Sequence, residues 1–246
     1  MKAVKNTELK KPDKRVADRD LLKEIEDMQF FMYALIHDLK APISNLNAIF
    51  SLIKDDTITD KPTLMEKAET VVHNMDHTIE KLNKLLVFKD GAGEDIKVLN
   101  FNKVYEELIS SEIAGNLEEV NFKTNFQECE TILYSETYLK CILSNLINNA
   151  IKYQSPKRRI QIHICSQRLG DHILLTVRDN GQGINMAEEG TILFKPFKRL
   201  SNSKEGSRLG LYMVKLLVEK NGGHLVIDST PNVGSTFTLY LKEYTL

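Results

Sequence analysis

The sequence predicts an α+β protein, in which a helical hairpin dimerises into a four-helix bundle and is followed by an α/β sandwich. Apolar residues recur every three or four positions through two long N-terminal segments. The segment "KDGAGED" then interrupts this pattern. Beyond it, short strand-like runs alternate with helical ones, as in a domain built from two packed layers.

The first helix is expected over about residues 21–56, after a flexible N-terminus at residues 1–18. Its apolar steps approach the 3.5-residue period of coiled coils and bundles. The turn formers and proline of "DDTITDKPT" end it. The apolar stripe consists of Leu21, Ile25, Met28, Met32, Leu35, Leu39, Ile43, Leu46, Phe50 and Ile53.

A second amphipathic helix is expected over about residues 63–89. Two such helices joined by a short loop form a hairpin, which cannot cover both of its apolar stripes alone. Pairing two hairpins into a four-helix bundle solves this problem. We therefore expect a homodimer, with residues 19–90 as the dimerisation hairpin and residues 91–98 as a linker. The second stripe consists of Leu64, Ala68, Val71, Met75, Ile79, Leu82 and Leu86.

Residues 99–246 are expected to form the second domain, because strand and helix patterns interleave there. A turn at Gly170 and Asp171 separates two strands, and Gly222 or Gly223 ends the last helix. In order, the expected elements are a helix at 102–113, strands at 120–126 and 131–134, a helix at 136–153, strands at 158–168 and 172–179, a loop-rich span at 180–208, a helix from 209, and strands at 224–230 and 235–241.

The overall composition excludes several classes of protein. The chain has 246 residues, of which 42% are hydrophobic and 27% charged, as in ordinary globular proteins. Its net charge of −1 disfavours a nucleic-acid binder, which usually carries a basic surplus. Neither a membrane-spanning apolar run nor a signal-peptide core is present, so we expect a cytoplasmic protein. Cys129, Cys141 and Cys165 are spaced too widely for a metal pattern and are expected to be buried thiols.

The motif "FMYALIHDLKAP" places His37 nearly opposite the apolar stripe, with Asp38 beside it. A solvated histidine without a task would fit this position. A metal site would require a second ligand three or four residues away, which the motif lacks. Alternatively, the imidazole is a nucleophile that the neighbouring carboxylate orients and deprotonates. Pro42 removes one helical hydrogen bond and can expose this face.

Two motifs of the second domain suggest a nucleotide site. "SNLINNAIKY" places Asn145, Asn149 and Lys152 along one helix, where amide oxygens suit Mg²⁺ already bound to phosphates. "VRDNGQGI" ends a strand with a carboxylate that can accept a hydrogen bond from an exocyclic amine such as that of adenine. Its glycines allow a close backbone approach, although an ordinary turn would fit the same pattern.

Two further motifs suit the phosphates of a nucleotide. "LFKPFKRL" supplies Lys195, Lys198 and Arg199 between Phe194 and Phe197, which is typical of a mobile, positively charged lid. "EGSRLGLYMV" is a glycine-containing loop that leads into a helix, and the free N–H groups at a helix N-terminus attract phosphate.

In this order, the segments "HDLKAP", "NLINNAIKY", "DNGQGI", "LFKPFKRL", "GSRLGL" and "GSTFTL" resemble the histidine kinases of two-component signalling, over about residues 25–242. The resemblance implies a dimerisation and phosphoacceptor hairpin followed by a catalytic ATP-binding domain of the Bergerat (GHKL) type, shared with gyrase, Hsp90 and MutL. It also implies autophosphorylation by ATP with Mg²⁺. The phosphoryl group would then pass to an aspartate in the receiver domain of a separate response regulator.

The same resemblance assigns roles to individual residues. His37 is implied to be the phosphoacceptor, Asp38 the base that activates it, and Asn149 the catalytic Mg²⁺ ligand. Asp179 is implied to recognise adenine, and Thr236 to lie beneath the nucleotide. The full set implied to bind the nucleotide is Asn145, Asn149, Lys152, Tyr153, Asp179, Gly181, Gly183, Ile184, Lys198, Arg199, Gly206, Ser207, Arg208, Leu209, Gly210, Leu211 and Thr236.

Two positions depart from the family pattern. Arg208 replaces the middle glycine of the usual G-x-G-L-G-L, which is expected to weaken the nucleotide site without abolishing it. Ala41 lacks the hydrogen-bonding group expected four residues after the histidine in kinases that also dephosphorylate their partner, so phosphatase activity is expected to be weak. The alternative function is a dimeric nucleotide-binding signalling scaffold with weak or no kinase activity. An ATPase of the gyrase or MutL kind would use neither the hairpin nor His37.

Overall fold

The computed structural model describes residues 36, 39–55, 57–89, 95–111, 120–190, 193–194 and 209–245. The chain divides into two compact units, Met1–Val72 and His73–Leu246. Several of the predicted site residues lie outside the described residues, namely His37, Asp38, Lys198, Arg199, Gly206, Ser207 and Arg208.

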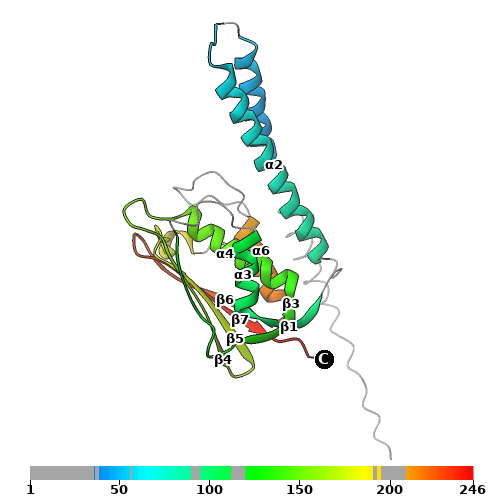
Figure 1. Cartoon of the computed structure of the whole chain (residues 1–246), viewed down its shortest axis with the longest axis vertical. Coiled ribbons are helices and arrows are strands. Elements are labelled where there is room, and N and C mark those ends of the chain that lie inside the picture. The colour runs from blue at the N-terminus through cyan, green and yellow to red at the C-terminus, as the bar shows by residue number, and fades with distance from the viewer. Residues whose placement is uncertain are drawn as a thin grey trace, which may run out of the picture. The chain divides into compact units, whose positions relative to one another are not determined.

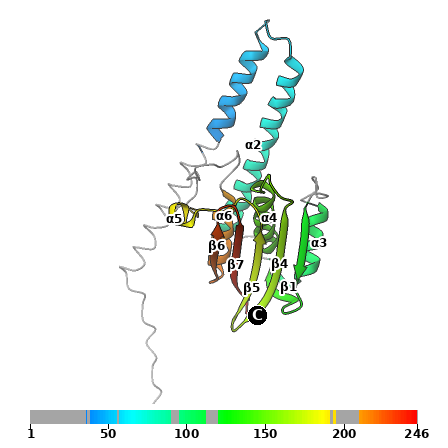
Figure 2. The same cartoon turned by 90° about the vertical axis from the view of Figure 1, so that its left-hand side faces the viewer.

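In the first unit, residues 39–53 are helical and lie beside the first part of α2 (Lys61–Lys89), as Figures 1 and 2 both show. The turn between the helices ends at Asp60, whose carboxylate accepts a hydrogen bond from the Thr63 N–H at 3.4 Å. Pro62 follows in the first turn of α2, where its missing N–H leaves no helical bond unmade. The prediction of two helices joined by a short turn is confirmed here.

The apolar side chains of this unit fall into an inner and an outer set. Ala68 is only 5% exposed, and Leu46, Leu64 and Val71 are half-buried. The outer set is spaced seven residues apart on each helix, so that it forms one exposed stripe per helix. Its members and their exposed fractions are Ile36 59%, Ile43 47% and Phe50 45% on the first helix, and Met65 52% and Val72 46% on α2, where Ile79 at 43% continues the spacing into the second unit. Leu52, which is 45% exposed, lies outside this spacing.

The second unit contains a five-stranded sheet with helices on one face, as Figure 2 shows. The strand order is β2-β4-β5-β7-β6, with β2 parallel to β4 and the other pairs antiparallel. A separate antiparallel pair joins β1 (Ile96–Asn100) to β3 (Thr131–Ser135). The remaining elements are α3 (Phe101–Ser111), β2 (Asn121–Asn125), α4 (Glu136–Lys152), β4 (Gln161–Leu169), β5 (His172–Asp179), α5 (Met186–Glu189), α6 (Leu209–Lys220), β6 (His224–Thr230) and β7 (Gly234–Lys242).

Strand alternation gives the sheet a covered face and an open face. On the covered face, side chains such as Leu175 and Leu239 are fully buried beneath the helices, and Leu146 of α4 is 1% exposed. The open face carries the residues between them, including Arg178 of β5, which pairs with Thr236 of β7. Only side chains on the covered face can therefore meet a ligand held against α4.

Most of the expected elements of this unit are present, with four differences. β1 begins at Ile96, inside the segment predicted as a linker; it has only five residues, and their burial does not alternate. β4 begins at Gln161, so the expected start at Arg158 was wrong. The loop-rich span contains the short helix α5. Cys165 is exposed because it points to the open face of β4, so the prediction of three buried thiols was wrong.

A network of charged side chains ties α4 to its neighbours. Glu136 pairs with Lys97 of β1 and, at 2.7 Å, with Lys140 of α4. Lys140 also pairs with Glu107 of α3 at 2.8 Å. Hydrogen bonds from Lys140 and Lys97 lower the pKa of Glu136 to about 2. Because this pKa is lower in the folded state, the stabilisation is fully present above the ordinary carboxyl range and is lost as the pH falls through it toward 2.

We expect Glu136→Gln to lower the free energy of unfolding at pH 7 by about 1 kcal/mol, a small value because the network is partly exposed to solvent. The difference from the wild type should shrink steadily between pH 5 and pH 3, as thermal unfolding at several pH values would show. Glu219→Gln is a matched control, since its partner Lys215 is 3.7 Å away on an exposed helix surface. A pH-independent loss in Glu136→Gln would contradict this explanation.

Candidate functional site

Asp179 is the centre of the candidate site, because it ends β5 on the covered face of the sheet. Its Oδ1 accepts hydrogen bonds from the N–H groups of Gly181 at 2.7 Å and Ser235 at 3.3 Å. Its Oδ2 accepts no hydrogen bond from the described residues. Burial raises the pKa of Asp179, while the two N–H donors and the charge of Arg158 act in the opposite direction. The carboxylate is thus held in one orientation, with one oxygen left for a ligand.

The loop after Asp179 packs against the C-terminal end of α4. The Gln182 N–H donates to the Tyr153 carbonyl at 2.9 Å, and the Gln182 side-chain amide donates to the Gln154 carbonyl at 3.1 Å. A Cβ on Gly181 would lie 2.7 Å from the Tyr153 carbonyl oxygen. Only glycine fits this close approach, which brings Asp179 next to the residues that end α4.

The same loop also contacts the β6–β7 hairpin. The Ile184 N–H donates to the Ser229 hydroxyl at 2.8 Å. Gly183 has a φ of 69°, and a Cβ there would lie 2.7 Å from the carbonyl carbon of Thr230 and closer still to its oxygen. Glycine is therefore required at position 183 for two reasons: the backbone is left-handed, and the Thr230 carbonyl group leaves no room for a Cβ.

On α4, Asn145 and Asn149 differ in their surroundings. The Asn145 amide donates to the Cys141 carbonyl at 2.7 Å, and a Cβ on Gly210 would lie 2.7 Å from the Asn145 Oδ1. Asn145 therefore lies where α6 begins. Asn149 is half-buried, and its side-chain amide makes no hydrogen bond within the part of the chain that the structure describes. Its oxygen is available for a ligand.

The structure brings together most of the predicted site residues that it describes. The Lys152 ammonium lies 4.9 Å from the centre of the Tyr153 ring, and Leu211 is half-buried in α6. Thr236 does not lie with these residues, because it points to the open face in register with Arg178 and Asp228. The residues brought together are Asn145, Asn149, Lys152, Tyr153, Asp179, Gly181, Gly183, Ile184 and Gly210.

Sequence reasoning missed two residues beside Asp179. Ser235 is only 7% exposed and holds the carboxylate through its N–H. Strand alternation in "GSTFTL" could have identified it, since Phe237 points inward and Ser235 precedes it by two positions. Arg158 was assigned to a strand, and no sequence signal marks its contacts with distant loops.

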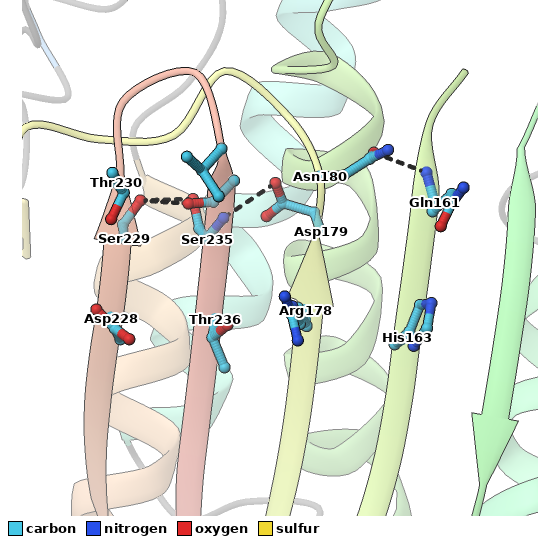
Figure 3. Close-up of a pocket in the computed structure, with 12 residues that line it drawn as sticks. Gln161, His163, Arg178, Asp179, Asn180, Asp228, Ser229, Thr230, Ser235 and Thr236 are labelled. Atoms are coloured by element: carbon cyan, nitrogen blue, oxygen red, sulfur yellow. Dashed lines mark hydrogen bonds between the residues drawn. The ribbon is translucent and has the colours of Figure 1, made fainter. Parts of the chain in front are cut away.

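Figure 3 shows the residues that line a cavity of about 420 Å³, with the helices behind the strands. Asp179 and Ser235 line it together with side chains of the open face. Burial and the nearby charges of Lys123 and Arg178 lower the pKa of His163, one of its lining residues. The cavity reaches Asp179, but no residue of α4 lines it, so we place the candidate nucleotide site on the covered face, beside α4. The open-face side chains that line the cavity are Gln161, His163, Arg178, Asp228, Thr230 and Thr236.

The described residues offer neither a membrane-spanning helix nor a metal cluster. No helix among them is both long and apolar enough to cross a membrane. They also contain no group of three or more His, Cys, Asp or Glu side chains that could hold a metal ion.

A family model described as histidine kinase-, DNA gyrase B- and HSP90-like ATPase matches residues 134–245. The alginate biosynthesis sensor protein KinB of Pseudomonas aeruginosa is 25% identical over 230 residues, covering 86% of this chain and 36% of that protein. The heme sensor protein HssS of Staphylococcus saprophyticus is 28% identical over 226 residues, covering 90% of this chain and 48% of that protein. The chain thus spans less than half the length of these two curated relatives.

Two solved structures share the fold. The histidine kinase AdeS of Acinetobacter baumannii has a TM-score of 0.67 and 21% identity, covering 85% of this chain and 98% of that one. The histidine kinase ThkA, in a complex with the response regulator protein TrrA, has a TM-score of 0.71 and 17% identity, covering 96% of this chain and 68% of that one. Residues 134–245 thus match an ATPase family that includes histidine kinases, and the two curated relatives are named as sensor proteins.

Proposed function

We propose that this chain is an ATP-dependent protein-histidine kinase that phosphorylates its own His37 and passes the phosphoryl group to an aspartate in the receiver domain of a separate response regulator. The observation that carries the proposal is the Asp179 Oδ2, which accepts no hydrogen bond from the residues that the structure describes and is held next to the end of α4 in an ATPase domain. Since ATP and receiver domains are found in the cytoplasm, we propose that the protein acts there.

Adenine recognition is proposed to rest on Asp179. Its Oδ2 would accept a hydrogen bond from the exocyclic amine, while the N–H groups of Gly181 and Ser235 hold Oδ1. The Asn149 amide oxygen would ligate Mg²⁺, which neutralises phosphate charge when bound. Lys152 adds positive charge on the same helix. The nucleotide contacts of Lys198, Arg199, Gly206, Ser207 and Arg208 remain predictions, whereas Thr236 points to the open face, away from this site.

The reaction would be an in-line phosphoryl transfer. A ring nitrogen of neutral His37 attacks the γ-phosphorus, so that an N–P bond forms as the bond to the leaving oxygen of ADP breaks. The ring proton passes to Asp38. Positioning and charge neutralisation would account for most of the rate enhancement, because the protein forms no covalent bond other than the one to the histidine.

The exposed stripes of the hairpin support a homodimer. Ile43, Phe50, Met65 and Val72 are each between 45% and 52% exposed and recur every seven residues. Heptad-spaced apolar side chains of this kind are typical of helices that pack against further helices. We propose that two hairpins bury these stripes in a four-helix bundle, with residues 19–90 as the dimerisation domain and residues 99–246 as the catalytic domain.

The direct test is incubation with Mg-ATP labelled on the γ-phosphate. We expect acid-labile, base-stable label on the wild type, and none on His37→Gln. His73→Gln is the matched control, since His73 is an exposed histidine on α2 and this variant should keep its label. Undiminished label on His37→Gln would refute the proposed acceptor.

A signalling scaffold without efficient phosphoryl transfer is the second candidate function. Arg208 favours it, because an arginine stands where the family usually has glycine. The labelling assay separates the two functions, since the scaffold would bind ATP without acquiring label.

A further inference from the structure

Arg158 lies between α4 and β4, and its guanidinium donates to four backbone carbonyl oxygens. Nε donates to Asn180 at 2.7 Å, and one terminal nitrogen donates to Gly181 at 2.7 Å. The same nitrogen donates to Asn232 at 2.7 Å and to Val233 at 3.1 Å. These acceptors belong to two loops about fifty residues apart in the sequence, and the planar donor fork of arginine can reach both.

Other hydrogen bonds join the same three chain segments. The Asn180 Oδ1 accepts from the Gln161 N–H at 2.8 Å, and its Nδ2 donates to the Arg159 carbonyl at 3.0 Å. The Asn232 N–H donates to the Gln182 carbonyl. Hydrogen bonds therefore link three segments, residues 153–161, 179–184 and 230–235, and we call this linked group the joint. Arg158 belongs to the first segment and donates to carbonyl groups of the second and third.

The joint includes the two loops whose N–H groups, those of Gly181 and Ser235, donate to Asp179. Two of the carbonyl acceptors follow Asp179 directly, in the loop whose Gly181 N–H binds Oδ1. The other two lie in the turn just before Ser235, whose N–H binds the same oxygen. A shift of either loop would move one N–H donor and turn the carboxylate. Arg158 itself is exposed and belongs to none of the predicted site positions.

We propose that Arg158 is a positioning residue, which joins the loop after β5 to the β6–β7 turn and thereby fixes the orientation of the Asp179 carboxylate for adenine recognition. This inference rests on the proposed binding of ATP at Asp179. Arg158 acts through backbone groups and through its charge, and it makes no contact with the reacting atoms. A lysine would retain the charge but could not reach both loops with its single ammonium group.

The charge provides a readout that a purely structural role would not change. Arg158 favours the ionised form of Asp179 against the effect of burial. The other charged groups near this end of the sheet, His163, Arg178 and Asp228, lie on the open face. On α4, the nearest basic side chain is that of Lys152, whose ammonium lies over the Tyr153 ring. Loss of the Arg158 charge should therefore raise the pKa of Asp179. ATP binding should then be lost at a higher pH on acidification.

The experiment compares Arg158→Lys, Arg158→Gln and Lys157→Gln in the full chain. Mg-ATP affinity is measured by titration calorimetry between pH 5 and pH 8. We expect about a tenfold loss of affinity in Arg158→Lys with an unchanged pH profile. Arg158→Gln should lose more, and its acid limb should move to higher pH. Lys157→Gln removes one exposed charge from the neighbouring position and should match the wild type.

Amide hydrogen exchange of the nucleotide-free protein tests the joint without ATP. The N–H groups of Gln182 and Asn232 should exchange faster in both Arg158 variants than in the wild type or Lys157→Gln. If the wild type fails to bind ATP, the proposed function is wrong, and exchange still decides whether Arg158 holds the loops. Unchanged exchange, or wild-type affinity and pH profile in Arg158→Gln, would overturn the inference.

Discussion

Asp179→Asn is expected to lower the affinity for Mg-ATP at least a hundredfold while leaving the fold as stable as the wild type, or more stable. Asparagine has the same shape, and its oxygen can still accept from the N–H groups of Gly181 and Ser235. Its NH₂ group then takes the place of Oδ2. The NH₂ group of the new asparagine and the adenine amine, both donors, would then face each other. Neither would have an acceptor in the bound state, and a buried donor without an acceptor weakens binding.

The expected gain in stability follows from the direction of the pKa shift. Burial raises the pKa of Asp179, so the folded protein holds this proton more tightly than the unfolded chain. Ionisation at neutral pH therefore destabilises the fold, and the stability contributed by this group falls as the pH rises through its pKa. The neutral asparagine lacks this penalty, and the associated pH dependence should disappear.

Titration calorimetry and thermal unfolding of the same Asp179→Asn preparation would measure both effects. Asp228→Asn is the matched control, because Asp228 is exposed on the open face of the sheet. Wild-type affinity in Asp179→Asn would remove Asp179 from adenine recognition. A large loss of stability would show that the charge supports the fold.

Gly183→Ala is expected to lower the free energy of unfolding by about 3 kcal/mol and to abolish ATP binding. The backbone at Gly183 has a φ of 69°, which is strained for alanine. The added methyl group would also overlap the carbonyl group of Thr230. Because neither backbone segment can move without breaking its hydrogen bonds, the loop that follows Asp179 should be displaced.

Gly170→Ala separates these two effects. Gly170 has a φ of 57°, and an added Cβ there would meet no atom within 4 Å. This variant should lose only about 1 kcal/mol, which is the backbone strain alone, and should bind ATP normally. Denaturant unfolding of both variants measures the difference. Equal losses would show that the contact with Thr230 contributes nothing.

Local patterns predicted much of the fold because they act within a few residues. The three-four spacing around Leu64 and Ala68 identified α2, and the turn at Gly170 and Asp171 separated β4 from β5. β1 was missed because its pairing with β3 is a long-range contact that five residues do not encode. The inner and outer apolar sets of the hairpin were also merged, since spacing alone does not say which side chains the second helix covers.

The candidate site shows the same limit. Asp179, Gly181 and Gly183 could be identified because a strand end and glycine spacing mark a close backbone approach. Ser235 and Arg158 act through backbone N–H and carbonyl groups of loops distant in sequence. Any residue type supplies such groups, so the sequence carries no signature of them. Only the folded chain shows that they converge on Asp179.

The central claim is that the nucleotide is held on the covered face of the sheet around Asp179. Backbone amide NMR shifts on adding Mg²⁺ and a non-hydrolysable ATP analogue would test it most directly. We expect the largest shifts at residues 145–153, at residues 179–184 and at Ser235, with His163 and Cys165 unaffected. Shifts confined to the open face, around His163 and Arg178, would contradict the claim.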